Sequence, residues 1–307
     1  MLYKKLSLFS FCTISTFSHL FKAFALANSI APFKGFLNIL VIDKIDNLVE
    51  KPENVNIYSL SDLKDNIGVQ IIDKYKNNQD KLRWALKPIF LKHLLNETNA
   101  VIYVDNDIYF YNDFAFLFKE LESNNVILTP HFYNSNPNED QNWLEANFRV
   151  GLYNAGFIGV NQQAIIALNW WANCCLYNVK KVFWRGLFDD QKYLDLFPIL
   201  FDNVKILKYK GCNLAGWNYL NYNLNRDPNG GLVIDSTNKL IFIHFAESSL
   251  VDFSKTNHLL NKEYKLYEEN LLNHHTTFSY KRSIFNKRTV YPFIYFLKWK
   301  LYRKIEN

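Results

Sequence analysis

The chain has few cysteines, and they follow no pairing pattern. Its 307 residues include four, at Cys12, Cys174, Cys175 and Cys212, and none belongs to a CxxC pair. Adjacent cysteines are poorly suited to a structural disulfide or a zinc site, so buried free thiols are the simpler interpretation. This usage fits a protein of the reducing cytoplasm.

Glycine-rich phosphate loops and long apolar runs are also missing. The chain has 10 glycines and no GxGxxG or Walker-type motif, which disfavours dinucleotide-binding and P-loop mechanisms. The apolar segment Leu6–Ile14 is too short to span a bilayer, and no small-residue cleavage site follows it. The net charge of +6 is spread along the chain until its last portion, so nucleic acid is not a favoured partner.

Hydrophobic and aromatic side chains are abundant and fall into alternating strand and helix patterns. They make up 49% and 17% of the chain, enough for one substantial core. Strands are predicted at Leu6–Ile14, Phe36–Asp43, Asn56–Leu60 and Ala100–Val104, and helices at His19–Asn28 and Lys87–Leu95. Alternation of this kind predicts an α/β fold with a mostly parallel central sheet flanked by helices. Ligands of such sheets bind outside the carboxyl ends of strands, where Thr13, Asp43 and Asp105 are expected to emerge.

The second half of the chain continues with the same kinds of segment. Further strands are predicted at Val126–His131, Gly151–Val160 and Lys239–Phe245, and helices through Leu121 and over Ala164–Leu176. The polar stretch Asn134–Asn142 is predicted to be a loop. Asp189 and Asp190 are predicted to lie at the start of another helix, where either could simply cap it.

Two carboxylates interrupt an apolar run near the middle of the chain. Asp105 and Asp107 follow the strand Ala100–Val104, and an apolar strand resumes after them. Because unpaired carboxylates are costly at the end of a buried strand, they are expected to face a cation, a ligand or fixed donors. Their hard oxygens suit Mg²⁺ or Mn²⁺, whose open positions substrate phosphates fill, so the natural partner is a diphosphate. His244, near the end of its predicted strand, offers a third ligand.

Other uses of the two aspartates differ in how well they fit. Asp-Asn-Asp also suits a turn or a helix N-cap. An EF-hand calcium loop is excluded, because Phe110 and Phe116 stand where glycine and glutamate would be needed. A phosphatase of the haloacid dehalogenase type resembles Asp-X-Asp-X-Thr, but Tyr109 takes the threonine position. A sugar nucleotidyltransferase would have a glycine-rich basic loop after its first strand, and Cys12–Asn28 has none.

Five landmarks, in order, resemble nucleotide-sugar glycosyltransferases of the A-type fold, particularly the group of glycogenin and the bacterial lipopolysaccharide galactosyl- and glucosyltransferases. They are Phe11–Ile14, Trp84–Pro88, the Asp105-Asn106-Asp107 (DXD) motif, Tyr153–Phe157 with its Asn-Ala-Gly, and the pair Asp190-Gln191. The resemblance extends from Phe9 to Ala246. The chain departs from it at His244-Phe245-Ala246-Glu247, where the group has His-Phe-Ser-Gly or His-X-X-Gly-X-X-Lys.

The resemblance implies a divalent ion, Mn²⁺ or Mg²⁺, held by Asp105, Asp107 and His244 and bridging the two phosphates of a nucleotide-sugar. Thr13 and Asp43 would then meet the nucleoside, and Arg83 and Lys87 would add positive charge beside the phosphates. The implied donor-binding residues are together Thr13, Asp43, Arg83, Lys87, Asn106, Asn154, Ala155 and Gly156.

Asp190 and Gln191 are the catalytic residues that the resemblance implies. With Asn154 they would hold the sugar hydroxyls and the reacting face. The group analogy implies retention of the anomeric configuration, whereas an inverting enzyme would need a carboxylate base, for which Asp190 could equally serve. The expected reaction moves a hexose, from a UDP-sugar on family grounds, to a saccharide or glycolipid acceptor in bacterial-type surface polysaccharide or lipopolysaccharide synthesis. A catalytically inert nucleotide- or sugar-binding α/β protein is the alternative.

The last portion of the chain is basic and aromatic. Residues 1–250 are expected to form the catalytic domain and 251–307 a helical extension. From Tyr280 onward, lysines and arginines alternate with aromatic and aliphatic residues, a composition that suits an anionic membrane surface. Peripheral attachment to the inner face of a membrane would fit a glycolipid acceptor. A helix packed on the catalytic domain, with its basic face solvated, is an equal alternative.

Overall fold

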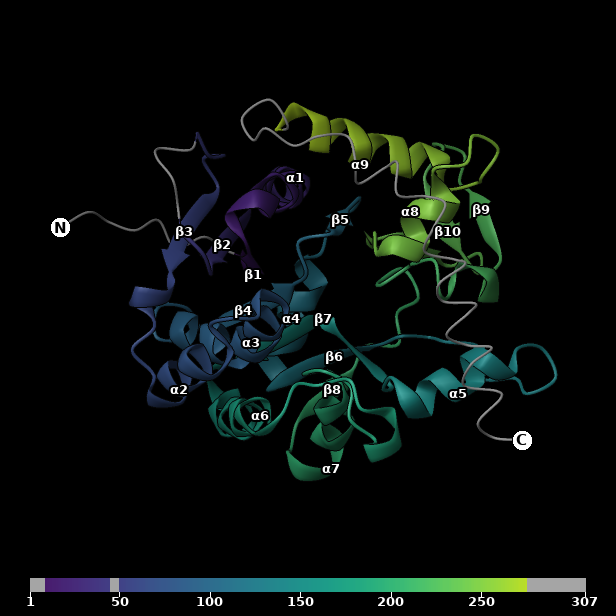
Figure 1. Cartoon of the computed structure of the whole chain (residues 1–307). Helices are drawn as coiled ribbons and strands as arrows, with labels where there is room; N and C mark the ends of the chain where they lie inside the picture. The colour runs from purple at the N-terminus through teal and green to yellow at the C-terminus, as the bar shows by residue number, and fades with distance from the viewer. Residues whose placement is uncertain (1–8, 45–49, 275–307) are drawn as a thin grey trace.

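The computed structural model describes residues 9–44 and 50–274, whose centre is a seven-stranded sheet (Figure 1). The strand order is β3-β2-β1-β4-β7-β6-β8, and β7 is the strand that runs against the others. The strands are β1 (Phe9–Ser15), β2 (Gly35–Val41), β3 (Val55–Ser59), β4 (Ala100–Val104), β6 (Val126–Pro130), β7 (Tyr153–Asn161) and β8 (Val204–Ile206). The predicted mostly parallel sheet is confirmed.

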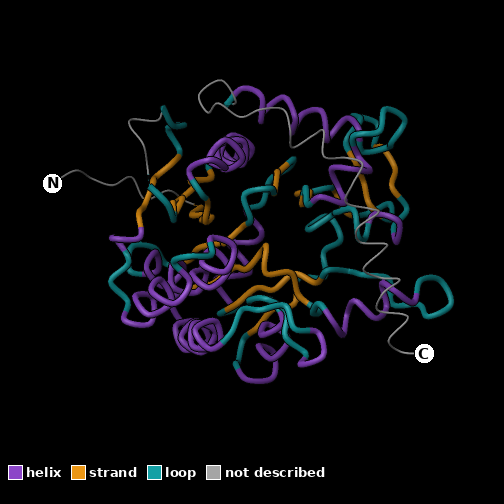
Figure 2. Tube along the Cα trace, in the orientation of Figure 1, coloured by secondary structure: helices purple, strands orange, loops and turns teal. Residues whose placement is uncertain are grey.

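Helices cover both faces of this sheet, as the tube in Figure 2 shows. One face carries α1 (Leu20–Ile30), α4 (Ala115–Ser123) and α9 (Asn261–Asn273); the other carries α2 (Asn66–Tyr75), α3 (Gln79–Leu95), α6 (Ile165–Tyr177) and α7 (Phe197–Leu200). Each face of the sheet packs against its helices in a hydrophobic core; we call the core beneath α1, α4 and α9 the first core and the core beneath α2, α3, α6 and α7 the second core. Side chains alternate along β1, so Phe11 packs into the first core while Cys12 and Ile14 pack into the second. The apolar sequence of the central strands therefore reflects burial on both faces.

Helix α3 begins eight residues before the predicted start at Lys87. Asn78 caps its N-terminus, with the side-chain oxygen accepting a hydrogen bond from the Lys81 N–H at 2.9 Å. Pro88 lies inside the helix, although proline in a sequence usually favours a helix start. Because of this extension, Arg83 and Lys87 lie on the same helix.

Two further predicted segments are corrected by the structure. The predicted loop Asn134–Asn142 leads into helix α5 (Gln141–Arg149), whose N-cap is Asp140. The predicted helix at Asp189 and Asp190 is instead a turn followed by a short 3-10 helix at Lys192–Leu196. Asp189 has a φ of 41°, which no helix accommodates.

Small sheets complete the fold beside the main one. The predicted strand Lys239–Phe245 is divided into β11 (Asn238–Lys239) and β12 (Phe242–His244). β11 joins β9 (Leu224–Arg226) and β10 (Leu232–Ile234), while β12 pairs with β5 (Ile108–Phe110) in an antiparallel arrangement that sets His244 opposite Ile108. This pairing brings the end of β12 to the residues that follow β4.

Residues 251–274 of the predicted extension pack into the first core. After α8 (Glu247–Phe253), helix α9 lies near α1 (Figure 1), and its Tyr267 ring stacks on Phe245 with centroids 4.2 Å apart. The boundary at residue 250 stays a prediction, and the basic and aromatic segment after Tyr280 lies outside the described residues. Within the described ranges, no helix is both long and apolar enough to cross a membrane.

Candidate functional site

The DXD segment forms a tight turn between β4 and β5. The Asp105 N–H donates to the Gly156 carbonyl at 2.8 Å, and the Ile108 N–H donates to the Asp105 carbonyl at 3.1 Å. The first bond ties the turn to the start of β7. Because β7 is antiparallel to β4, its amino end reaches the edge of the sheet where β4 ends. Asn154, Ala155 and Gly156 therefore meet the DXD turn.

Asp107 and His244 form one half of the site. His244 Nε2 lies 3.1 Å from Asp107 Oδ1, and the Phe245 N–H donates to the Asp107 carbonyl at 2.7 Å. Burial opposes both charges, but the two groups stabilise one another, so the pKa of Asp107 is lowered and the pKa of His244 is raised. One ligand atom from each of Asp105, Asp107 and His244 lies within 4.8 Å of the other two.

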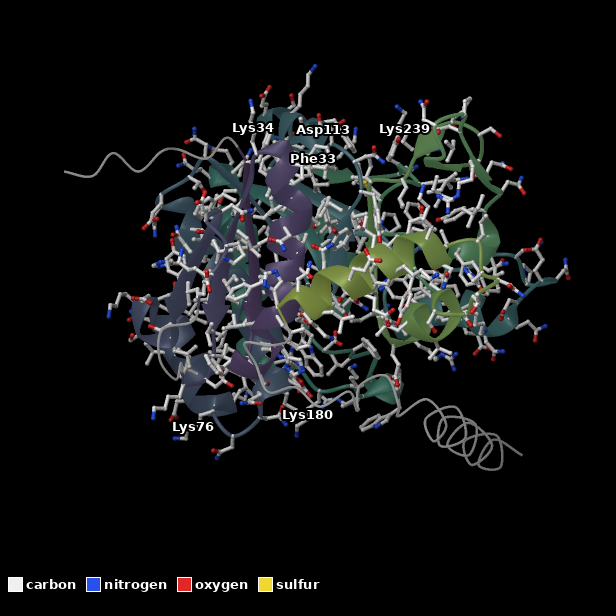
Figure 3. The ribbon with its side chains drawn as sticks, turned by 90° about the horizontal axis from the view of Figure 1, so that it is seen from above. Phe33, Lys34, Lys76, Asp113, Lys180 and Lys239 are labelled. Carbon is white, nitrogen blue, oxygen red and sulfur yellow. The ribbon has the colours of Figure 1, made fainter. Side chains whose placement is uncertain are left out.

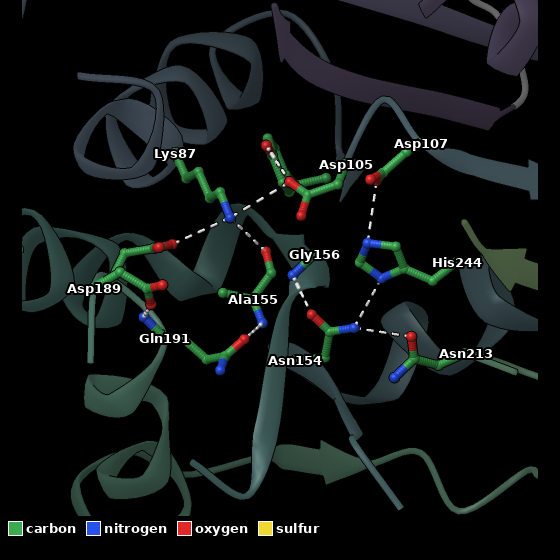
Figure 4. A network of polar contacts seen from close by, with 12 residues as sticks. Lys87, Asp105, Asp107, Asn154, Ala155, Gly156, Asp189, Gln191, Asn213 and His244 are labelled. Atoms are coloured by element: carbon green, nitrogen blue, oxygen red, sulfur yellow. Dashed lines mark hydrogen bonds and ion pairs between the residues drawn. The ribbon is translucent and has the colours of Figure 1, made fainter. Parts of the chain in front are cut away.

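Lys87 organises the other half of the site (Figure 4). Its ammonium group donates to the Ala155 carbonyl at 3.0 Å and lies 3.5 Å from Asp105 Oδ1 and 3.3 Å from Asp190 Oδ2. The side chain is 4% exposed. Burial opposes its charge, but Asp105 and Asp190 raise its pKa above the ordinary value. We call Lys87, Asp105, Asp190 and Ala155 the lysine bracket.

Asp190 and Gln191 are fixed from three sides. The Trp171 indole N–H donates to the Asp190 carbonyl at 2.9 Å, and Gln191 Oε1 accepts the Ala155 N–H at 3.2 Å. Burial raises the pKa of the Asp190 carboxyl to about 7 against the opposing effect of Lys87, and the neighbouring Asp189 adds to the rise. The predicted catalytic pair thus meets Ala155 of the predicted Asn-Ala-Gly segment.

An amide network links the two halves. Asn154 Oδ1 accepts the Gly156 N–H at 2.8 Å, while Asn154 Nδ2 donates to Asn213 Oδ1 at 2.8 Å and lies 3.0 Å from His244 Nδ1 (Figure 4). A Cβ atom added at Gly156 would lie 2.7 Å from both Asp105 Oδ2 and His244 Cε1. The missing side chain keeps open the space between the carboxylate and the imidazole.

The remaining predicted donor-binding residues lie around this centre. Asn106 Nδ2 donates to Ser15 Oγ at 3.1 Å, and Asp43 Oδ1 accepts the Phe17 N–H at 2.7 Å. Arg83 pairs with the Asp80 carboxylate on α3. Thr13 is fully buried inside β1, two residues before its end, and its hydroxyl has no hydrogen-bond partner in the described ranges. Contacts of these residues with a nucleotide stay predictions.

Several residues of the site were not predicted. Tyr103 donates its hydroxyl to Asp105 Oδ1 at 2.8 Å, and its spacing of two from Asp105 in an extended segment could have indicated a shared face. Asn213 lies in a loop at a φ of 64° and carries no sequence signal. Beside His244, ring contacts join four further aromatic residues, which we call the aromatic wall: His131, Tyr133, Trp143 and Trp217.

The donor set at this centre fits a divalent cation. Two carboxylates and an imidazole are ligands that Mn²⁺ or Mg²⁺ sites use, with positions left over for a substrate. Asp105 and Asp190 also place two carboxyl groups around the single ammonium of Lys87, an imbalance that a divalent cation would reduce. The space above Gly156 lies between two of the three ligands.

Comparisons with known proteins show the fold. No protein-family model matches the chain. It is 28% identical over 285 residues to YfnF of Bacillus subtilis (strain 168), a protein of uncharacterized function, with 85% of this chain and 91% of YfnF covered. The apo structure of the bifunctional glycosyltransferase WbbM is similar, with a TM-score of 0.52 and 15% identity over 92% of this chain. This chain spans about half of WbbM, since 52% of that protein is covered.

A second solved structure, of an active-site variant of the galactosyltransferase LgtC, is similar over 85% of this chain and 95% of LgtC. Its TM-score is 0.50 and its identity to this chain is 11%. At these identities the likeness establishes a shared glycosyltransferase-like fold. The chemistry has to be argued from the residues of the site.

Proposed function

We propose that this protein is a metal-dependent glycosyltransferase that moves a hexose from a nucleotide-sugar to a saccharide or glycolipid acceptor. The observation that carries the proposal is the convergence of Asp105, Asp107 and His244 at the edge of the sheet where the parallel strands end. The fold shared with WbbM and LgtC supports it. A UDP-sugar donor and a pathway of surface polysaccharide or lipopolysaccharide synthesis stay predictions from the resemblance.

Asp105, Asp107 and His244 would hold Mn²⁺ or Mg²⁺. When bound, such an ion supplies Lewis-acid neutralisation of charge on a departing diphosphate. The departure at Ala246-Glu247 from the family ending does not prevent His244 from reaching Asp107, because pairing of β12 with β5 sets its position. Ser249 adds support, since its hydroxyl donates to the His244 carbonyl at 2.7 Å.

Positive charge for the diphosphate would come from residues at the rim of the site. We assign this role to Lys22, in the first turn of α1, and Arg83, in the first half of α3. Both cations act on His19, where burial lowers the pKa and Lys22 and Arg83 add to that effect. Lys87, expected beside the phosphates, is engaged in the lysine bracket instead. We assign it the role of a positioning residue for Asp105 and Asp190.

Retention is the favoured stereochemical outcome within this proposal. An inverting enzyme needs a carboxylate that can take a proton from the acceptor hydroxyl. Asp190 is 1% exposed and its Oδ2 lies 3.3 Å from the Lys87 ammonium, so its carboxylate faces an internal cation. The anomeric configuration of the new glycosidic bond, read by proton NMR and compared with that of the donor, distinguishes the two outcomes.

The proposal is tested with a panel of nucleotide-sugars and Mn²⁺, measuring release of nucleoside diphosphate. We expect turnover with one donor, its loss on chelation, and a decrease of about 10³-fold or more in Asp107→Asn. Asp113→Asn is the matched control, because Asp113 accepts the Ala115 N–H at 2.7 Å and asparagine preserves that acceptor. Calorimetry of UDP binding with Mn²⁺ is measured in parallel. Absence of both turnover and UDP binding would refute the proposal.

A further inference from the structure

A short hairpin projects from the chain just before the catalytic pair. After α6, Val182 and Leu187 form an antiparallel bridge, with the Val182 N–H donating to the Leu187 carbonyl at 2.8 Å. Phe183–Arg185 form a 3-10 turn between them. Gly186 closes the turn at a φ of 65°, and among the described residues none lies within 4 Å of a Cβ atom placed there. Residues 183–186 are all exposed.

Large aromatic side chains point away from the core at this hairpin. Trp184 is 85% exposed, more than any other large hydrophobic residue of the described ranges, and Tyr177 and Phe183 are 61% and 48% exposed. Exposed apolar side chains are ordinary when they are scattered. Three aromatic rings within eight residues are a contiguous feature, which marks a surface for interaction. Tryptophan and tyrosine are the side chains enriched where water meets lipid.

The same segment is purely basic. Lys180, Lys181 and Arg185 fall between Asn178 and Phe188, and this interval has no acidic residue. Lys181 faces the base of the hairpin, 3.5 Å from Asp189 Oδ2 and over the Trp84 ring at 4.8 Å. Arg185 donates to the Tyr177 hydroxyl at 2.9 Å. We call Tyr177, Lys180, Phe183, Trp184 and Arg185 the tip patch.

The tip patch lies at the edge of the molecule that bears the site. In Figure 3, Lys34, which directly precedes β2, marks the edge where the parallel strands begin, and Lys180 lies at the opposite edge. The hairpin also runs straight into Asp189, Asp190 and Gln191, and its Lys181 contacts α3 one turn before Lys87. Attachment through the tip patch would consequently present the mouth of the site to the attached surface.

We propose that the tip patch inserts into the interfacial layer of an anionic lipid bilayer. Phe183 and Trp184 would enter the boundary between headgroups and acyl chains, and Lys180 and Arg185 would meet anionic headgroups, as the combination of aromatic bulk and positive charge requires. Attachment itself is independent of the proposed glycosyl transfer. Its consequence, that the acceptor is a lipid-linked saccharide delivered from the membrane plane, rests on the proposed function.

The test measures partition of the full chain into phosphatidylcholine vesicles with and without phosphatidylglycerol. We expect Phe183→Ser/Trp184→Ser to weaken partition by about tenfold or more. The matched control is Ile166→Ser/Leu220→Ser, which removes two apolar side chains that are 75% and 80% exposed elsewhere and should leave partition unchanged. We expect Lys180→Gln/Arg185→Gln to lose most of the preference for the anionic lipid, about fivefold for each charge.

A second measurement locates the tryptophan directly. Brominated lipids should quench wild-type fluorescence, and Trp184→Phe should lose much of that quenching while it retains vesicle binding. Equal partition of Phe183→Ser/Trp184→Ser and the wild type, or absence of wild-type binding to anionic vesicles, would overturn the proposal. The proposal would also be overturned if Phe183→Ser/Trp184→Ser partitioned like the wild type but lost turnover with a water-soluble acceptor, because the tip patch would then contact substrate. Because partition needs no nucleotide, failure here is separable from failure of UDP binding.

Discussion

Lys87 and His244 stand on opposite sides of the space above Gly156, and each meets one aspartate of the DXD turn. The lysine bracket is closed inward at Lys87 and Asp190, which are 4% and 2% exposed, while its Asp105 side chain is 34% exposed and also belongs to the cation centre. The Asp107–His244 half has side chains that are 24% and 8% exposed. The Lys87–Asp190 pair therefore neutralises its charges within the fold, while Asp105, Asp107 and His244 leave two carboxylates and an imidazole in reach of a ligand.

The two halves also differ in what holds them. The bracket draws on α3, the end of β4 and the start of β7, which lie next to one another in the second core. The His244 half depends on pairing of β5 with β12 across more than a hundred residues and on the aromatic wall. Loss of the bracket should cost folding free energy, whereas disturbance of the His244 half should cost ligand binding with little loss of stability.

The largest effect is expected from Lys87→Met, which removes the cation of the bracket. The buried Asp190 carboxyl and the 34%-exposed Asp105 carboxylate would lose their partner, and the loss of one partner of a buried ion pair costs about 3–5 kcal/mol in the free energy of unfolding. Denaturant unfolding at pH 7.5 measures it. Lys92→Met on the same helix is the control, because the Lys92–Asp65 pair, at 2.6 Å, is more exposed than the Lys87–Asp190 pair, and its loss should cost about 1 kcal/mol or less.

A double variant sharpens this result. Lys87→Met/Asp190→Asn removes one of the two stranded charges together with the ammonium, so part of the lost stability should return. If Lys87→Met lowers the free energy of unfolding no more than Lys92→Met does, the lysine bracket does not stabilise the fold, and the contrast between the two halves of the site fails.

A smaller effect, on metal affinity, is expected from a substitution at Gly156, where the two halves of the site meet. Gly156→Ala would place a methyl group 2.7 Å from both Asp105 Oδ2 and His244 Cε1, so these two ligands must move apart. We expect Mn²⁺ affinity, measured by calorimetry, to fall by about 10–100-fold, the range found when ligand orientation is disturbed. Gly159→Ala on the same strand is the control, because its added Cβ would meet Leu121, Ile127 and Ile102 instead. Equal affinity losses in both variants would point to general strain in β7.

The positions of the central strands could be predicted from the sequence, but the direction of β7 could not. β1, β2, β4 and the DXD turn were predicted because they are apolar runs with a marked interruption. The direction of β7 was not, since an apolar run reads the same in either direction. Its antiparallel course is what brings Asn154 and Gly156 to the turn.

Pairing between strands that are far apart in the sequence was the second feature that could not be predicted. The sequence indicated that His244 ends a strand, but not that β12 is three residues long and pairs with β5. Asn213 and most of the aromatic wall come from loops and strand ends with no periodic signal, and Trp143 comes from α5. Asp190 and Gln191 were found through resemblance, and the contacts of Ala155 with Lys87 and Gln191 became evident only in three dimensions.

The last prediction concerns the aromatic wall, which is kept neutral where the bracket is charged. His131 donates from Nδ1 to the Gly151 carbonyl at 3.0 Å, and burial lowers its pKa to about 3. The unfolded chain binds a proton at this residue below its ordinary pKa of 6.5, so stability falls as the pH drops through 6.5, and this loss ends near pH 3. At pH 5 the residue should cost about 2 kcal/mol relative to pH 7.5.

His131→Asn, which keeps a donor for Gly151 and cannot titrate, should lose correspondingly less stability than the wild type between these two pH values in denaturant unfolding. Other carboxyl and imidazole groups titrate alike in both proteins, so the difference between the two losses isolates His131. Equal losses would mean that His131 is protonated as easily in the fold as in the unfolded chain. In that case the wall beside His244 admits charge, and the contrast between a charged lysine bracket and a neutral aromatic wall would fail.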